Sequence, residues 1–182
     1  PFAWFKWEAL FQDWRLFAKG FLYTIELSIF ALLLALVIGV IVGICATSHS
    51  KVLRGIMRVF VEFFQNTPLL VQMFILYYGL PFLGVILSVT TIGIISVGVY
   101  HGAYIAEVVR SGIGSITKGQ FEAAYSQGFT YWQAMRHIIL PQAMKVIMPP
   151  LTMQAVNLIK NTSLIAIISG ADIIFTAKSW SS

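Results

Sequence analysis

The chain has 182 residues, of which 58% are hydrophobic and only 10% charged, and its mean hydropathy is +0.84. Soluble domains carry about a quarter charged residues, so this composition excludes an ordinary soluble domain and indicates an integral membrane protein. The net charge of +5 does not indicate nucleic acid as a partner, because the basic residues fall near the ends of apolar runs, as in the positive-inside bias of membrane proteins.

Aromatic and charged side chains alternate at helical spacing in the first 20 residues. Tryptophan prefers the headgroup level of a membrane, so residues 1–20 are predicted to form an interfacial amphipathic helix and residues 21–182 the transmembrane domain. The alternative is an aromatic belt that leads directly into the first span. The aromatic residues are Trp4, Trp7, Phe11, Trp14 and Phe17. No initiator methionine or signal peptide precedes them, which indicates a fragment without its N-terminal part.

The first predicted span, Leu27–Thr47, holds 21 uncharged residues. At about 1.5 Å per residue, a helix of this length covers about 31 Å, enough for the hydrocarbon core of a bilayer. Gly39 and Gly43 stand four residues apart, a spacing that permits close approach of another helix, and we interpret them as a packing feature. The only cysteine, Cys45, lies in this run, so no internal disulfide is possible.

The second predicted span, residues 61–81, is less regular than the first. Its first half is polar and contains Asn66, Thr67 and Pro68, whereas its second half is apolar. A proline kinks a helix unless it stands at a helix start. The sequence therefore predicts a kink at Pro68 or a new helix there, with Asn66 or Thr67 as its cap.

Two more apolar runs follow, at residues 86–109 and 146–169. At the end of the third span, Glu107 and Arg110 are three residues apart and are predicted to form a structural ion pair. The fourth run starts with the pair Pro149-Pro150. The sequence thus predicts an all-α polytopic membrane protein with four spans.

Basic residues gather in two of the segments that connect these spans. Alternation of the spans puts both segments on one face of the membrane, and the positive-inside bias makes that face cytoplasmic. The N-terminus is then external and residues 110–145 cytoplasmic. The first segment has Lys51, Arg54 and Arg58, and the second has Arg110, Lys118, Arg136 and Lys145.

Residues 119–141 are predicted to form two short helices joined at a glycine. The sequence FEAAYSQ favours a first helix, and Gly128 stands where a left-handed residue would end it. Thr130 lies three residues before Gln133, the spacing of a capping box that starts a second helix. Pro141 is expected to end this helix, because the residue before a proline avoids the α region.

A purely structural elbow explains this pattern about equally well, since helical corners are common. The first helix, however, carries one charge, Glu122, beside the aromatic residues Phe121, Tyr125 and Phe129. Aromatic side chains presented to water with few charges favour a partner surface.

The same stretch resembles the EAA loop of bacterial binding-protein-dependent ABC importers. The resemblance rests on Glu122-Ala123-Ala124, a glycine at Gly128, and Ile138 followed by Leu140-Pro141. The segments FFQNTPLLVQMFILYYGLP, HGAYIAEVVRSGI, KGQFEAA, ILPQA and NLIKNTSL are similar to the polar amino-acid permease branch of that family. The resemblance extends from Gly20 to about Asp172.

The resemblance implies that the loop couples the spans to an ABC ATP-binding subunit, with ATP and magnesium bound by that subunit and no cofactor or metal in this chain. It further implies a second, identical or related permease copy and an extracellular or periplasmic substrate-binding protein. The coupling residues carried over are Glu122, Ala123, Ala124, Gly128 and Pro141. Small alanines would allow close docking, and Gly128 would set the angle of the corner.

The chain departs from the family pattern at two points. Many relatives have arginine where this chain has Gln65, so the role of that charge is open here. The family core has five spans and the sequence carries four, so we expect the last span to lie outside it.

Polar residues inside spans are costly and often mark a substrate pathway. Three of them, Gln154, Asn157 and Lys160, recur at steps of three on one helix face, which is predicted to line the pathway or a subunit contact. His101 is interpreted as a packed residue. The full set of predicted pathway residues is Asn66, Thr67, Gln72, Tyr104, Gln154, Asn157 and Lys160.

The sequence therefore predicts a permease subunit that moves polar amino acids, glutamine or basic ones, across a prokaryotic cytoplasmic membrane. The chain carries no Gly-Lys-Ser/Thr phosphate loop of its own. The alternatives are an ion-gradient-driven secondary transporter, which needs intramembrane carboxylates, and a membrane scaffold or sensor. An enzyme is disfavoured, because no nucleophile–base pair or metal-ligand cluster is apparent. The sequence does not decide which amino acid is carried. It also does not decide whether the permease forms a homodimer or a heterodimer.

Overall fold

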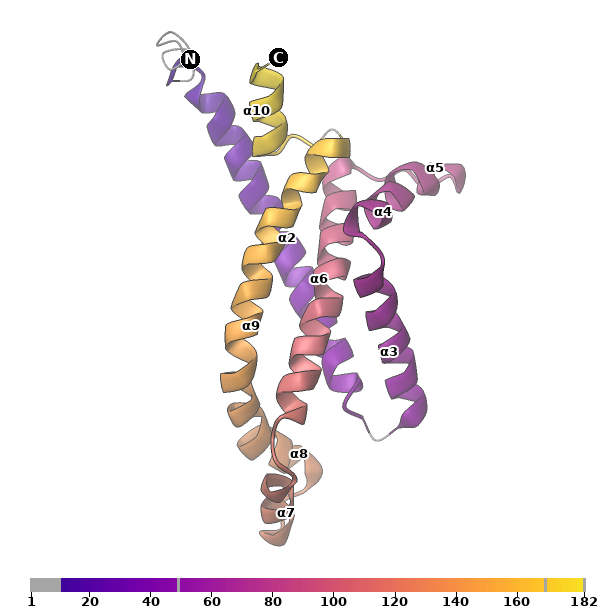
Figure 1. Ribbon diagram of the computed structural model, residues 1–182, viewed down its shortest axis with the longest axis vertical. Helices are drawn as coiled ribbons and strands as arrows, with labels where there is room; N and C mark the ends of the chain where they lie inside the picture. Colours follow the sequence, from indigo (N-terminus) through magenta and orange to yellow (C-terminus); the bar gives the residue numbers. More distant parts are fainter. Residues whose placement is uncertain (1–10, 49, 169, 182) are drawn as a thin grey trace.

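The computed structural model describes residues 11–48, 50–168 and 170–181, and in these ranges every regular element is a helix (Figure 1). Three helices are long and apolar enough to cross a membrane, and a bent pair brings the number to four, which confirms the predicted all-α polytopic fold. The elements are α2 (Trp14–Cys45), α3 (Lys51–Asn66), α4 (Leu69–Phe74), η1 (Ile75–Gly79), α5 (Leu80–Phe82), α6 (Val89–Gly114), α7 (Lys118–Ser126), α8 (Tyr131–Ala134), η2 (Met135–Ile139), α9 (Leu140–Asn161), η3 (Thr162–Ile168) and α10 (Ile173–Ser181).

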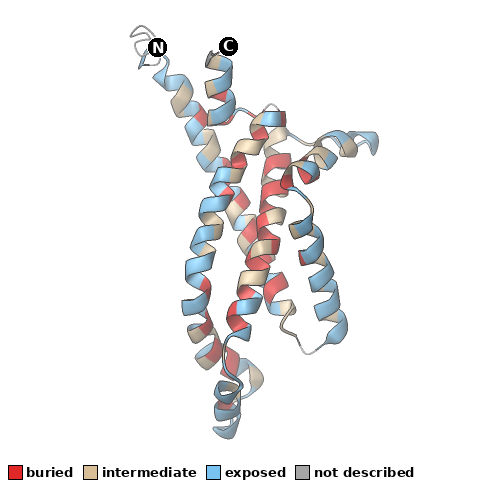
Figure 2. Ribbon diagram, in the orientation of Figure 1, coloured by how far each residue is buried: buried red, intermediate tan, exposed pale blue. Residues whose placement is uncertain are grey.

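Helix α6 is the centre of the bundle and packs against α2, α3, α4 and α9 (Figure 2). Its contact with α2 depends on glycines from both helices. A Cβ atom on Gly43 would lie 2.7 Å from Val109 Cβ, and one on Gly102 of α6 would lie 2.9 Å from Ile38 Cγ2. The glycines therefore let the two backbones approach, as small residues do between membrane helices. The packing interpretation of Gly39 and Gly43 is confirmed, since both are buried in this contact.

The first span begins earlier than the apolar run alone predicts. Helix α2 is continuous from Trp14, so the residues between Trp14 and residue 20 extend the helix of the first span, and their interfacial location stays a prediction. The rest of that predicted helix, up to residue 10, lies outside the described residues. This end of α2 meets α10, where Trp180 Nε1 donates a hydrogen bond of 2.8 Å to Asp13 and its ring lies edge-on to Phe17.

The second span is broken at the predicted place. Helices α3 and α4 meet at Pro68, and Lys51–Asn66 and Leu69–Phe82 are bent by 97°. The predicted cap is wrong, because Asn66 and Thr67 donate their side-chain hydrogen bonds backward, to the carbonyls of Glu62 and Phe63. These bonds satisfy the last turn of α3 instead of the first turn of α4.

Gln72, in α4, closes the break. Its Nε2 donates to the carbonyl of Phe64 at 3.0 Å and to that of Thr67 at 2.9 Å. A buried glutamine amide thus supplies donors to carbonyls that the interrupted helix leaves without N–H partners.

The fourth span corrects the prediction that Pro141 ends a helix. Tyr131–Ile168 runs as one helical segment, with a π-turn, η2, immediately before α9. In this turn the N–H of Leu140 reaches back five residues to the carbonyl of Met135. A π-turn widens the backbone, so the proline ring is accommodated without ending the helix. Pro149 and Pro150 also lie inside α9 rather than at its start.

Figure 1 shows that the loop between α2 and α3 and the α7–α8 elbow lie at the same end of the molecule. The N-terminal end of α2 and α10 lie at the opposite end. Both basic segments counted in the sequence therefore belong to one end of the bundle.

Candidate functional site

The elbow formed by α7 and α8 is the candidate functional site. It turns at Gly128, whose φ of +81° lies in the left-handed region. The N–H of Gly128 donates to the carbonyl of Tyr125 at 3.0 Å, and the N–H of Phe129 to that of Ala124 at 3.1 Å. These two bonds are those of a Schellman motif, so the predicted glycine corner is confirmed.

The second helix of the elbow starts with the predicted capping box. Gln133 N–H donates to Thr130 Oγ1 at 3.4 Å, and Thr130 N–H donates to Gln133 Oε1 at 2.8 Å. Two N–H groups at the helix start are thereby satisfied by side chains. Local residues thus determine where α7 ends and where α8 begins, so the corner between the two helices has a defined backbone geometry.

The exposed face of α7 carries Glu122 and Ala123, both open to solvent. Ala124 is fully buried, on a helix that packs against α8 and η2. The expectation that both alanines offer a docking surface is therefore wrong for Ala124, whose small side chain lets the elbow fold on itself. Tyr125, at 46% exposure, adds an aromatic ring to the outer surface.

Trp132, at the start of α8, is 74% exposed and was missed by the sequence analysis. A large exposed aromatic side chain in a partly polar elbow is typical of a binding surface. The sequence did carry a signal for this exposed residue. Trp132 stands in the first turn of a capped helix, where few positions face the core.

The elbow is tied to two spans. It follows α6 directly and runs through η2 into α9. In addition, Gln142 Nε2 in α9 donates to Gln120 Oε1 in α7 at 3.1 Å and to the carbonyl of Ile138 at 2.9 Å. Because α6 and α9 also pack on each other, α7 is connected through both helices to the centre of the bundle. Pro141 is exposed beside this junction.

Replacing Gly128 by valine should loosen this corner. No atom lies within 4 Å of a Cβ placed at Gly128, so the cost is the left-handed backbone alone, about 1–2 kcal/mol. Amide hydrogen exchange of α7 should become faster, whereas exchange in α6 should not change. Asparagine, which tolerates this conformation better, should have a smaller effect, and equal effects of both substitutions would contradict the backbone explanation.

The polar residues of the spans fall into two groups, and one of them is a buried network around His101. Gln154 Oε1 lies 3.2 Å from His101 Nδ1, and Asn161 Nδ2 lies 3.0 Å from His101 Nε2. An amide oxygen only accepts and an amide nitrogen only donates, so the ring is a neutral imidazole with its proton on Nδ1. This network joins α6 to α9 through the half-buried Gln154, and the interpretation of His101, 2% exposed, as a packed residue is confirmed.

The second group is partly open. Asn157 and Lys160 are exposed on α9, and Asn66 is exposed at the break of the second span. Tyr104 is half-buried, with its hydroxyl 3.2 Å from that of Tyr100. Thr67 and Gln72 are engaged at the break described above. The structure therefore separates Gln154 from the exposed pair Asn157 and Lys160, although the three recur at steps of three.

Glu107 and Arg110 form the ion pair that their spacing predicts, with Arg110 Nε 2.8 Å from Glu107 Oε2. Within the described ranges, no three His, Cys, Asp or Glu side chains gather as a metal site requires.

Comparisons with known proteins agree with this architecture. The family model of the binding-protein-dependent transport system inner membrane component matches residues 11–181. The probable glutamine ABC transporter permease protein GlnM of Bacillus subtilis is 43% identical, over 92% of this chain and 78% of that protein. The putative glutamine transport system permease protein GlnP of Rickettsia typhi is 40% identical, over 88% of this chain and 74% of that protein.

Solved structures show the same fold. A chain in a crystal structure of an amino acid ABC transporter with histidines superposes with a TM-score of 0.87 at 31% identity, over 93% of this chain and 79% of that one. The MetNI methionine ABC transporter in an inward-facing conformation gives 0.73 at 20% identity, over 88% and 77% of the two chains, which supports the fold alone. The chain therefore belongs to the family of binding-protein-dependent transport system inner membrane components, the membrane-spanning permease subunits of ABC transporters.

Proposed function

We propose that this permease imports a polar amino acid, with glutamine first among the candidates, and that a separate ATP-binding subunit drives it through the α7–α8 elbow. The observation that carries the proposal is the elbow itself, a defined corner with an exposed outer face that follows α6 along the chain and is hydrogen-bonded to α9. The names of the relatives, glutamine and amino-acid permeases, support the substrate class.

The partners follow from the same family. We expect a second permease copy, two ATP-binding subunits that bind ATP and magnesium, and a substrate-binding protein on the external side. The end of the bundle that carries the elbow also carries the basic segments, and the positive-inside bias supports a cytoplasmic location for this end. The N-terminus is then external and residues 110–145 are cytoplasmic.

Reconstitution into liposomes tests the proposal. Liposomes that carry the permease, its ATP-binding subunit and the binding protein should take up labelled glutamine only when ATP is enclosed in the liposomes, on the side of the ATP-binding subunit. A protonophore should leave uptake unchanged. Uptake that collapses with the proton gradient and ignores ATP would instead favour the ion-gradient-driven secondary transporter, and labelled arginine and histidine tested in parallel decide the substrate class.

Asn157 and Lys160 are proposed to face the substrate, together with Tyr104. Their side chains supply donors for the substrate carboxylate, and no acidic partner of Lys160 occurs among the described residues. Replacing Lys160 by glutamine should raise the KM for uptake roughly tenfold or more, because a hydrogen bond to a charged group contributes about 1.5–3 kcal/mol.

The matched control is Lys145→Gln, an exposed lysine of the same helix, which should leave the KM unchanged. Gln154→Ala should instead lower the melting temperature, because it removes one of the two partners of His101. If Asn157→Ala and Lys160→Gln leave both KM and Vmax unchanged, this face does not line the pathway.

A further inference from the structure

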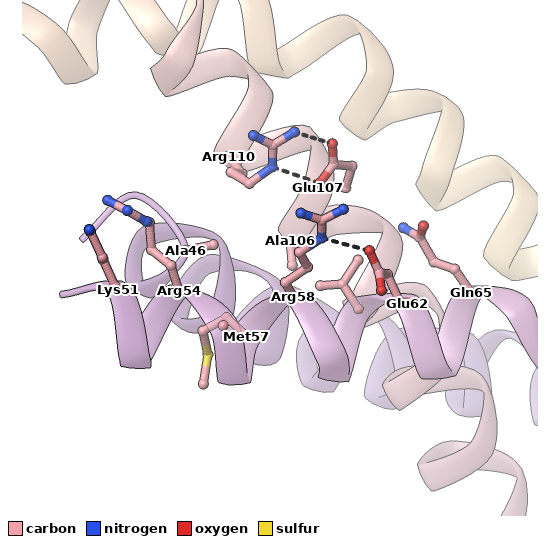
Figure 3. A pocket seen from close by; sticks show the side chains of 12 residues that line it. Ala46, Lys51, Arg54, Met57, Arg58, Glu62, Gln65, Ala106, Glu107 and Arg110 are labelled. Carbon is pink, nitrogen blue, oxygen red and sulfur yellow. Dashed lines mark hydrogen bonds and ion pairs between the residues drawn. The ribbon is translucent and has the colours of Figure 1, made fainter. Parts of the chain in front are cut away.

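A groove of about 690 Å³ lies between α3 and the end of α6, and charged side chains line it (Figure 3). In Figure 3 the Arg58 and Glu62 side chains of α3 extend toward the side where Glu107 and Arg110 of α6 lie. Four lining residues are cationic and two are acidic, which leaves an excess of two positive charges. The charged residues are Lys51, Arg54, Arg58, Glu62, Glu107 and Arg110.

Both carboxylates of the groove are already engaged. Arg58 Nε donates to Glu62 Oε1 at 2.7 Å, and Arg110 pairs with Glu107 in the bidentate manner. Lys51 and Arg54 stand at the end of the groove nearest the α2–α3 loop. Arg54 donates one hydrogen bond to the carbonyl of Ser48 at 3.1 Å. Within the described ranges, neither cation has a carboxylate within ion-pair distance, so both retain donors for an anion.

Helix α3 also presents an apolar stripe beside these cations. Val52, Ile56, Val59 and Phe63 recur at steps of four, three and four, and their exposed fractions run from 57% to 74%. Val52, Val59 and Phe63 each directly follow a charged residue, so the stripe lies about 100° around the helix from the charged positions. It starts level with Lys51 and runs away from the basic end of the bundle.

The length of the stripe matches one half of a bilayer. Eleven residues separate its ends, which is about 16 Å of helix, and the hydrocarbon core of one leaflet is about 15 Å deep. A ligand with an anionic head at Lys51 and Arg54 and an apolar tail about one leaflet long fits both features. A free anion fits only the first.

We propose that the groove between α3 and α6 binds the phosphodiester headgroup of an anionic phospholipid, with an acyl chain along the apolar stripe of α3. Basic pockets between membrane helices recognise anionic lipid headgroups in this way. Because α3 packs on the rest of the bundle through a small contact around Val61 and Ala106, a bound lipid would also hold α3 against α6.

Native mass spectrometry of the permease in detergent tests the proposal by titration with dioleoylphosphatidylglycerol. The double substitution Lys51→Gln/Arg54→Gln should weaken binding of the first lipid about 30-fold, since each basic residue near the surface contributes about 1 kcal/mol. The charge-preserving pair Lys51→Arg/Arg54→Lys should retain it. The matched control Lys118→Gln/Lys145→Gln removes two exposed lysines outside the groove and should bind as the unaltered chain does.

Two further arms separate a lipid from a simple anion. Ile56→Ser/Val59→Ser leaves every charge in place and should still weaken lipid binding, and excess inorganic phosphate should not displace the lipid. Three results would overturn the proposal. Phosphatidylcholine could bind as tightly as phosphatidylglycerol, or Lys51→Arg/Arg54→Lys could lose as much affinity as Lys51→Gln/Arg54→Gln. The third is displacement of the bound lipid by phosphate. Melting temperatures of all variants should match that of the unaltered chain, and a double variant that melts lower is replaced by its two single substitutions.

Discussion

Replacing Gly43 by alanine should destabilise the bundle by about 1–3 kcal/mol, the usual cost of forcing extra atoms into a packed contact. The added Cβ would lie 2.8 Å from the backbone carbonyl oxygen of Ala106 and 2.7 Å from Val109 Cβ. Neither neighbour is the free end of a flexible side chain, so α2 must move away from α6. Because α6 holds the centre of the bundle, this shift should also loosen α9. The measurement is the melting temperature of the purified protein in detergent.

The chain offers a matched control for this change. Gly55 lies inside α3, and nothing lies within 4 Å of a Cβ at that position. Gly55→Ala makes the same chemical change in a helix and should stabilise it by about 0.5–1 kcal/mol through backbone entropy. Opposite signs for the two substitutions are expected. A Gly43→Ala protein as stable as Gly55→Ala would show that α2 and α6 do not approach as closely as the structure has them.

Local rules predicted most of the elbow because its signals are short-range. The glycine at residue 128 and the pair Thr130 and Gln133 act within one or two turns, and no distant contact is needed to satisfy them. The same holds for the ion pair of Glu107 and Arg110, whose spacing alone brings them together. For these residues, the local sequence contains the whole explanation.

The failures arise where tertiary packing overrides a local preference. Pro141 does not end its helix, because a π-turn before it removes the conflict between the proline and the preceding backbone. Asn66 and Thr67 bond to carbonyls four residues behind them at the end of α3, because this bond competes with capping of the next helix. Which of two adjacent alanines is buried depends on the angle at which α8 returns, and spacing does not encode that angle.

The pathway residues show the same limit. Steps of three put Gln154, Asn157 and Lys160 on neighbouring positions of α9, yet a face about 100° wide can be shared between the core and an open surface. His101 on α6 decides the division, because it takes Gln154 as a partner and leaves the other two exposed. A sequence without contacts gives no sign of that pairing.

The second large effect concerns coupling. Replacing Ala123 by tryptophan should abolish ATP-driven uptake while leaving the fold intact. Ala123 is exposed on the outer face of α7, so a large ring there can extend into solvent and should leave the melting temperature unchanged. If α7 seats in a cleft of an ATP-binding subunit, the same ring prevents a close fit. Loss of a central contact of this kind costs at least about 2 kcal/mol, so the affinity of the two subunits should fall about 30-fold.

Two neighbouring variants separate this explanation from general damage. Ala123→Ser keeps a small side chain and should retain uptake and subunit affinity. Ala124→Trp should behave differently from Ala123→Trp, because Ala124 is fully buried and a tryptophan there must open the elbow, which lowers the melting temperature and speeds amide exchange in α7. The measurements are co-purification with the ATP-binding subunit, ATP-dependent uptake in liposomes, and thermal unfolding. Undiminished uptake by Ala123→Trp would mean that the outer face of α7 is not where the ATP-binding subunit acts, and the elbow would then be only a connection between α6 and α9.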